Sequence, residues 1–137
     1  MSSQPKVLYM VLCDGFSTEP NSGKKTLLGV FDKIAFKNFP SAYPSFTIAI
    51  GLEGGQDHYE LGTVVKDPSN KIVFRSPTVG VTPKAPYYRE DVILQINGFK
   101  FEGGPGRYVV DVTINNTGVL SSHPIFVEQV PAKIVSA

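Results

Sequence analysis

The chain has 137 residues, of which 42% are hydrophobic and 18% are charged, so its composition excludes a disordered or a membrane-spanning chain. Thirteen basic residues nearly balance twelve acidic ones, so the sequence predicts neither a nucleic-acid footprint nor a basic membrane-binding patch. The length fits one core, and we expect a single domain over residues 1–137.

Two apolar runs predict strands near the N-terminus. The run from Lys6 to Cys13 predicts a strand that is buried on both faces, and the acidic residue after it argues against a signal peptide. A second strand is expected over Lys25 to Phe31, where Gly29 marks a bulge or a close backbone approach. Lys33 to Phe36 is expected to continue that strand after a kink at Asp32.

Prolines and turn residues divide the middle of the chain. The segment from Phe39 to Pro44 is expected to be a connection, because proline cannot donate a hydrogen bond within a paired strand. Alternation from Phe46 to Leu52 then predicts a strand. Tyr59 to Lys66 and Lys71 to Arg75 are expected to pair as a hairpin about the turn Asp67-Pro68-Ser69-Asn70.

The stretch from Ser76 to Pro86 is rich in proline and is expected to be irregular. A strand is expected over Asp91 to Asn97, with Val92, Leu94 and Ile96 facing inward.

The clearest strand pattern lies near the C-terminus. From Tyr108 to Ile114 the apolar side chains alternate with Asp111 and Thr113, which predicts a half-buried strand. The polar run from Asn115 to Gly118 tolerates positive φ and predicts the turn of a hairpin, whose second arm reaches Val127.

Eight or nine short strands separated by turns predict an all-β fold, an antiparallel β-sandwich of the immunoglobulin-like kind. Gly106-Arg107-Tyr108 resembles the tyrosine corner of such sandwiches, in which the tyrosine hydroxyl binds backbone a few residues upstream. Alternation alone also permits a closed barrel.

Glycine-rich pieces of the chain do not match cofactor motifs. Gly23-Lys24 lacks the correctly spaced glycine, the hydroxyl residue and the helix of a phosphate-binding loop. The segment from Gly103 to Gly106 precedes a strand, whereas a dinucleotide fingerprint precedes a helix. We therefore expect turns at both places and no cofactor.

Metal and acid–base chemistry are also not indicated. His58 and His123 lie far apart in sequence, and neither belongs to a ligand-spaced pair. Asp14, Glu19 and Asp32 flank early loops, and calcium binding there is the alternative to ordinary turn carboxylates. We predict no catalytic residues and no metal site.

Aromatic residues in two proline-rich connections are the candidate binding residues: Tyr87, Tyr88 and Arg89 in one, and Phe39 and Tyr43 in the other. Tyrosine and arginine are enriched at binding hot spots, and prolines hold a loop in shape at low entropic cost. The alternative is that these aromatic side chains cap the ends of the core.

Short motifs spread over most of the chain carry a family resemblance. They are Leu12-Cys13-Asp14, Gly23-Lys24, Leu27, Gly29-Val30-Phe31-Asp32, Phe39-Pro40 and Gly106-x-Tyr108. On these motifs the chain resembles an uncharacterised family of small all-β bacterial proteins, a domain of unknown function. The resemblance implies a bacterial cytosolic β-sandwich and offers no activity or site residue to transfer.

The sequence as a whole predicts a non-catalytic interaction or structural module with a protein partner, and self-association is a further option. A small-ligand or carbohydrate-binding module is the main alternative; an enzyme whose site assembles only in the fold and a calcium-dependent lipid-binding sandwich are others. No nucleic-acid or membrane partner is expected. Cys13 is the sole cysteine and cannot form an intramolecular disulfide, which favours a cytoplasmic location.

Overall fold

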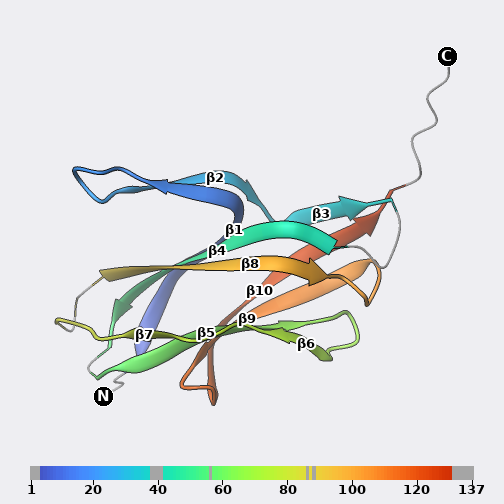
Figure 1. Cartoon of the computed structure of the whole chain (residues 1–137). Coiled ribbons are helices and arrows are strands. Elements are labelled where there is room, and N and C mark those ends of the chain that lie inside the picture. The colour runs from blue at the N-terminus through green and yellow to red at the C-terminus, as the bar shows by residue number, and fades with distance from the viewer. Residues whose placement is uncertain (1–3, 38–41, 56, 86, 88, 131–137) are drawn as a thin grey trace.

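The computed structural model describes residues 4–37, 42–55, 57–85, 87 and 89–130, which form ten strands in two sheets (Figure 1). The first sheet has the order β2-β1-β4-β8 and contains β1 (Pro5–Thr18), β2 (Lys25–Phe31), β4 (Ala42–Gly54) and β8 (Arg89–Lys100). The second has the order β3-β10-β9-β5-β6, with β7 also on β5, and contains β3 (Lys33–Phe36), β5 (Tyr59–Lys66), β6 (Ile72–Arg75), β7 (Val79–Val81), β9 (Gly106–Ile114) and β10 (Gly118–Gln129). The expected all-β sandwich is confirmed, with one strand more than expected.

The two sheets pack through their inner faces, which carry the core. The alternating apolar residues of three strands supply much of it, as expected: Phe46, Ile48, Ile50 and Leu52 of β4, Val92, Leu94 and Ile96 of β8, and Tyr108, Val110, Val112 and Ile114 of β9. Burial of these side chains against the opposite sheet is the main force that holds the layers together.

The tyrosine corner is confirmed. The Tyr108 hydroxyl donates a hydrogen bond of 2.9 Å to the carbonyl oxygen of Gly104, four residues upstream. The side chain has no exposed surface, and its ring meets Phe101 edge-on with centroids 5.1 Å apart. Burial, together with the charge of Asp67, raises the pKa of the Tyr108 hydroxyl.

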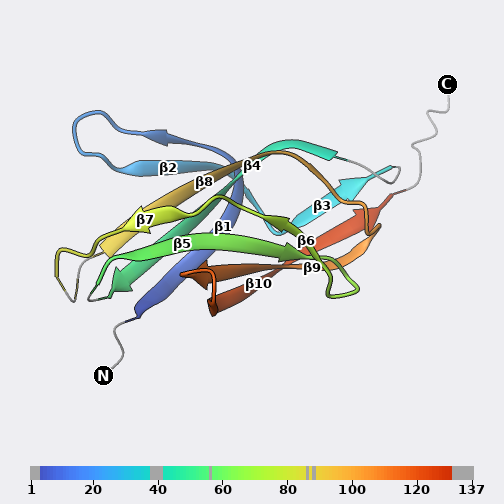
Figure 2. The same cartoon turned by 60° about the horizontal axis from the view of Figure 1, so that its bottom comes forward.

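β3 does not continue β2, contrary to expectation. The chain crosses at Asp32 from the first sheet to the second, where β3 pairs in parallel with β10 (Figure 2). The Phe126 amide donates to the carbonyl oxygen of Asp32 over 2.9 Å and holds the crossing point. The crossing buries Ile34 in the core, which explains why an extension of β2 into solvent is not adopted.

Two other expectations about proline-rich segments are wrong in part. Val79–Val81 forms β7 on β5 inside the stretch expected to be irregular. β4 begins at Ala42 and so includes Pro44, which was assigned to a connection. Pairing of β4 with β1 ends at Thr47, so only β8 flanks β4 at Pro44, and a proline is tolerated on that open side.

Two predictions of face burial are also wrong. β1 was expected to be buried on both faces, but Leu8 is 37% exposed, because none of the described segments covers the outer face of the first sheet there. β9 was expected to be half-buried, but Asp111 is only 3% exposed. β9 is a central strand, and neighbouring strands cover Asp111 with Lys66, 3.1 Å away, and Ser122, 2.6 Å away.

Candidate functional site

The first two strands extend past the sandwich as a two-stranded hairpin, which we call the arm (residues 14–30; Figures 1 and 2). β1 pairs with β4 only as far as Cys13, opposite Thr47. Its pairing with β2 continues to Thr18, opposite Lys25. Beyond Cys13 the described chain places no third strand beside the hairpin, so the arm contributes both of its faces, the edge of β2 and the outer edge of β1 to the surface.

Local chemistry shapes the arm at both ends. At its base, Gly29 has φ +67° and lies so close to Asp14 that a Cβ atom there would meet the carboxylate Oδ2 at 2.5 Å. The close approach expected at Gly29 is therefore confirmed. At its tip, the Glu19 carboxylate accepts hydrogen bonds from two backbone amides, that of Asn21 over 3.2 Å and that of Ser22 over 2.5 Å. Hydrogen bonding from Ser22 and then Asn21 lowers the pKa of Glu19 and identifies it as a turn carboxylate.

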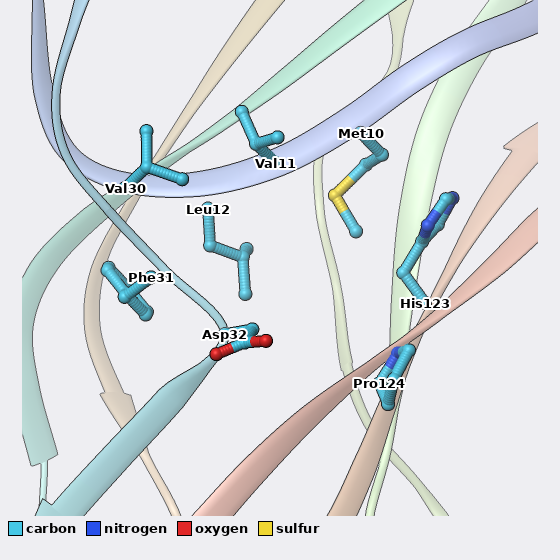
Figure 3. Close-up of a pocket in the computed structure, with 8 residues that line it drawn as sticks. All are labelled: Met10, Val11, Leu12, Val30, Phe31, Asp32, His123 and Pro124. Carbon is cyan, nitrogen blue, oxygen red and sulfur yellow. The ribbon is translucent and has the colours of Figure 1, made fainter.

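A cavity of about 450 Å³ opens between the two sheets at the base of the arm (Figure 3). Its lining comes from β1, β2, the crossing segment and β10: Met10, Val11, Leu12, Val30, Phe31, Asp32, His123 and Pro124. Figure 3 shows Met10 and Leu12 pointing from β1 into the space between the sheets, toward the segments that carry Asp32 and His123. Most of this lining is apolar, and its volume lies in the range of roughly 300–1,000 Å³ typical of binding pockets.

Exposed apolar side chains continue from the cavity along the arm. Val30 is 59% exposed, Leu28 is 52% exposed and Phe16 is 40% exposed. The strand register puts Val30 and Leu28 on one face of the arm and Phe16 on the other, so both faces carry exposed apolar surface next to the cavity, which is typical of a contact surface.

His123 supplies a polar group at the edge of the cavity. Its Nε2 atom lies 2.8 Å from the Ser121 hydroxyl oxygen. Burial lowers the pKa of His123, and the charge of Asp111 opposes that shift only in part. The imidazole is therefore neutral at pH 7, and since Ser121 occupies Nε2, the Nδ1 atom is left to offer one donor or one acceptor to whatever enters the cavity.

The serine, histidine and aspartate side chains near β10 do not form a nucleophilic relay. Ser121 and His123 pair with Val112 and Val110 and so share the inner face of the second sheet. Ser122 pairs with Asp111 on the outer face. A relay needs one histidine hydrogen-bonded to both a serine and a carboxylate, and here the sheet separates the two pairs.

The residues expected from sequence to form a binding surface lie at two distant places. Tyr87 is 81% exposed, and Arg89 is exposed at the start of β8, opposite Glu53. Tyr43 lies in β4, where its backbone pairs with Phe99 near the other end of β8, roughly 30 Å along the strand from Arg89. Tyr88 and Phe39 lie outside the described residues.

Neither the cavity nor the arm was anticipated from sequence. The available signal was the run Leu27-Leu28-Gly29-Val30-Phe31, in which apolar residues occupy successive positions of a strand. Such a run has no polar face to present to solvent, so it predicts either a buried strand or an exposed contact surface.

No cluster of three or more histidine, cysteine or acidic residues that could hold a metal ion occurs in the parts of the chain that the structure describes. Cys13 is buried and unpaired, and burial raises the pKa of its thiol. The described segments also contain no helix that could cross a membrane.

The two sheets and the tyrosine corner define a small all-β sandwich domain. The chain belongs to a family of unknown function (DUF6941), whose model matches residues 8–128. The family resemblance inferred from the motifs is thereby confirmed. No protein curated for its function matches the sequence.

Solved structures share the fold at low sequence identity. The alkylpurine DNA glycosylase AlkC of Pseudomonas fluorescens, bound to DNA with an abasic-site analogue, superposes with a TM-score of 0.53 at 12% identity. That match covers 90% of this chain and 30% of the glycosylase, so the chain spans less than a third of that protein. The C-terminal domain of wzt gives a TM-score of 0.51 at 7% identity, covering 97% of this chain and 84% of that domain. At these identities the likeness concerns the fold alone.

Proposed function

We propose that this chain is a non-catalytic interaction module that binds apolar side chains of a protein partner in the cavity at the base of the arm. The single observation that carries the proposal is the apolar cavity of about 450 Å³, continued outward by Val30 and Leu28. Burial of such surface contributes about 25 cal/mol per Å² toward a complex, from which the entropic costs of association are subtracted. The separation of the His123 and Asp111 pairs on opposite faces of β10 supports a role without catalysis.

The expected partner class and location follow from the same residues. The near balance of thirteen basic and twelve acidic residues supports a protein partner over nucleic acid or a membrane surface. A lone buried Cys13 suits a reducing compartment, so we place the module in the cytoplasm. The loop with Tyr87 and Arg89 stays a second predicted contact surface, supported by the high exposure of Tyr87.

A small-ligand-binding module is the second candidate function. It is favoured by the cavity volume together with His123, whose neutral ring would orient a polar group inside an otherwise apolar lining. A carbohydrate is less well served, because the chain has no tryptophan to form a stacking platform.

The test is affinity capture from a lysate of the native source with quantitative mass spectrometry, comparing wild type with Val30→Glu. Val73→Glu in β6 is the matched control, because Val73 is also a half-exposed valine and lies outside the cavity lining. We expect a partner that Val30→Glu loses and Val73→Glu retains. A partner retained by Val30→Glu and lost by Tyr87→Ala would contradict the cavity and place the interface on the other loop. A co-purifying small molecule seen by native mass spectrometry, with no protein partner, would favour the second candidate.

A further inference from the structure

β2 is the least protected sheet edge among the described strands. Natural proteins guard edges with charged residues, prolines or very short strands. β8, the other edge of the first sheet, carries charged residues at Arg89, Glu90, Asp91 and Lys100. The edge strands of the second sheet, β3, β6 and β7, have only four, four and three residues. β2 has seven residues, Lys25–Phe31, with one charged residue, no proline and two exposed apolar side chains.

The arm also lacks a stabilising third strand. Its outer part pairs Gly15 with Leu28 and Thr18 with Lys25, and β4 does not reach it. A two-stranded ribbon is marginally stable in water, whereas three or more strands with a shared apolar face are stable. A strand added to the free edge of β2 would therefore stabilise the arm and cover its exposed apolar residues.

We propose that a second copy of this chain supplies that strand, so that two β2 edges pair antiparallel about a two-fold axis at Leu28. This pairing goes beyond the proposed function, because it uses the free edge of β2 and requires nothing in the cavity. Two identical antiparallel strands are related by a two-fold axis, the commonest symmetry of protein dimers. The two four-stranded sheets would then join through the arms into one continuous sheet.

The charges that flank β2, Lys24 just before the strand and Asp32 just after it, favour this register. Lys24 and Asp32 each lie four positions from Leu28, on opposite sides of it. With Leu28 opposite its own copy, Lys24 of each chain lies opposite Asp32 of the other, and Thr26 lies opposite Val30. Opposite charges and β-branched pairs directly across a strand pair stabilise it, so the dimer gains two of each. A net charge of only +1 on each copy opposes association weakly.

The test is sedimentation velocity of the full chain over a concentration series. Because one strand pair buries less area than a standard interface, we expect a dimer with Kd of roughly 10 µM. Leu28→Lys places two lysines opposite each other and should raise Kd roughly tenfold. Val73→Lys in β6, where an exposed aliphatic side chain is likewise replaced by lysine, is the matched control and should leave Kd unchanged.

Charge exchange tests the register. Lys24→Glu places acidic residues opposite Asp32 and should weaken the dimer, whereas Lys24→Glu combined with Asp32→Lys should restore it. Both residues are exposed, so the fold should tolerate the changes, and circular dichroism checks this for every variant.

A wild-type chain that stays monomeric at a concentration about ten times the expected Kd would overturn the proposal. The proposal would also be overturned if Leu28→Lys left the dimer Kd unchanged, or if adding Asp32→Lys to Lys24→Glu did not restore the dimer. Val30 belongs to both surfaces, so Leu28→Lys separates them: loss of the dimer with partner capture retained would support this pairing independently of the cavity proposal.

Discussion

Tyr108→Phe tests the corner that fixes the start of β9. The substitution removes one hydroxyl and keeps the ring, so its packing against Phe101, with centroids 5.1 Å apart, is preserved. What is lost is the hydrogen bond of 2.9 Å to the carbonyl oxygen of Gly104. Tyr108 is fully buried but Gly104 is half-buried, so water can replace the hydroxyl at that carbonyl only in part.

The expected loss follows from that single bond. A hydrogen bond contributes about 0.5–1.5 kcal/mol net, and a half-buried carbonyl left without its donor adds to the loss, so we expect about 1–2 kcal/mol. With an unfolding entropy of about 2.1 cal/mol/K per residue, a chain of 137 residues has about 0.3 kcal/mol/K. The melting midpoint should therefore fall by roughly 3–7 °C.

Differential scanning calorimetry and urea unfolding measure the change. Tyr87→Phe is the control, because Tyr87 is 81% exposed and should show no shift. Gly103→Ala gives a second check, because a Cβ atom there would lie 2.9 Å from the Tyr108 hydroxyl. That substitution should destabilise the wild type more than it destabilises Tyr108→Phe. An unchanged midpoint in Tyr108→Phe would refute the corner as a stabilising feature.

Three further substitutions have defined outcomes. Val112→Asp buries an unpaired charge on the inner face and should abolish the cooperative melt seen by circular dichroism; a folded variant would refute the face assignment. Gly29→Ala forces an alanine into positive φ against Asp14. It should lower the free energy of unfolding by about 1–2 kcal/mol in urea and speed amide hydrogen exchange in the arm. An exchange rate equal to that of the wild type would contradict this. His123 has a lowered pKa in the folded state, so below pH about 6.5 its imidazole binds a proton more readily in the unfolded chain. The free energy of unfolding should therefore fall as pH drops below that value. His123→Leu should remove that part of the pH dependence, and an unchanged slope would show that His123 is not its source.

Alternation and turn chemistry predicted most of the fold. Strand β9 was found because Tyr108 to Ile114 alternates, and its hairpin turn because Asn115 and Asn116 tolerate the observed φ of 53° and 59°. The turn at Asp67 was predicted because its four residues, Asp67-Pro68-Ser69-Asn70, are typical of turns. In the structure the Asn70 amide donates a hydrogen bond of 2.8 Å to the Asp67 carbonyl oxygen. These features depend on neighbours in sequence, which is why sequence patterns show them.

Features that depend on distant partners were not predicted. The crossing at Asp32 is set by pairing of β3 with β10, about ninety residues away, and by burial of Ile34. Burial of Asp111 depends on Lys66 and Ser122 from flanking strands. The cavity likewise joins residues 10–12 and 30–32 to residues 123 and 124, and no local pattern places those three segments together.

We propose the arm and the cavity beside it as the contact surface, and Val30 lies where the two meet. A photo-reactive amino acid incorporated at Val30 in cells of the native source tests this most directly, with the same residue at Val73 as the control. We expect a covalent adduct with another polypeptide, a partner or a second copy, at Val30 and not at Val73. Equal adducts at both positions, or none at Val30, would contradict it.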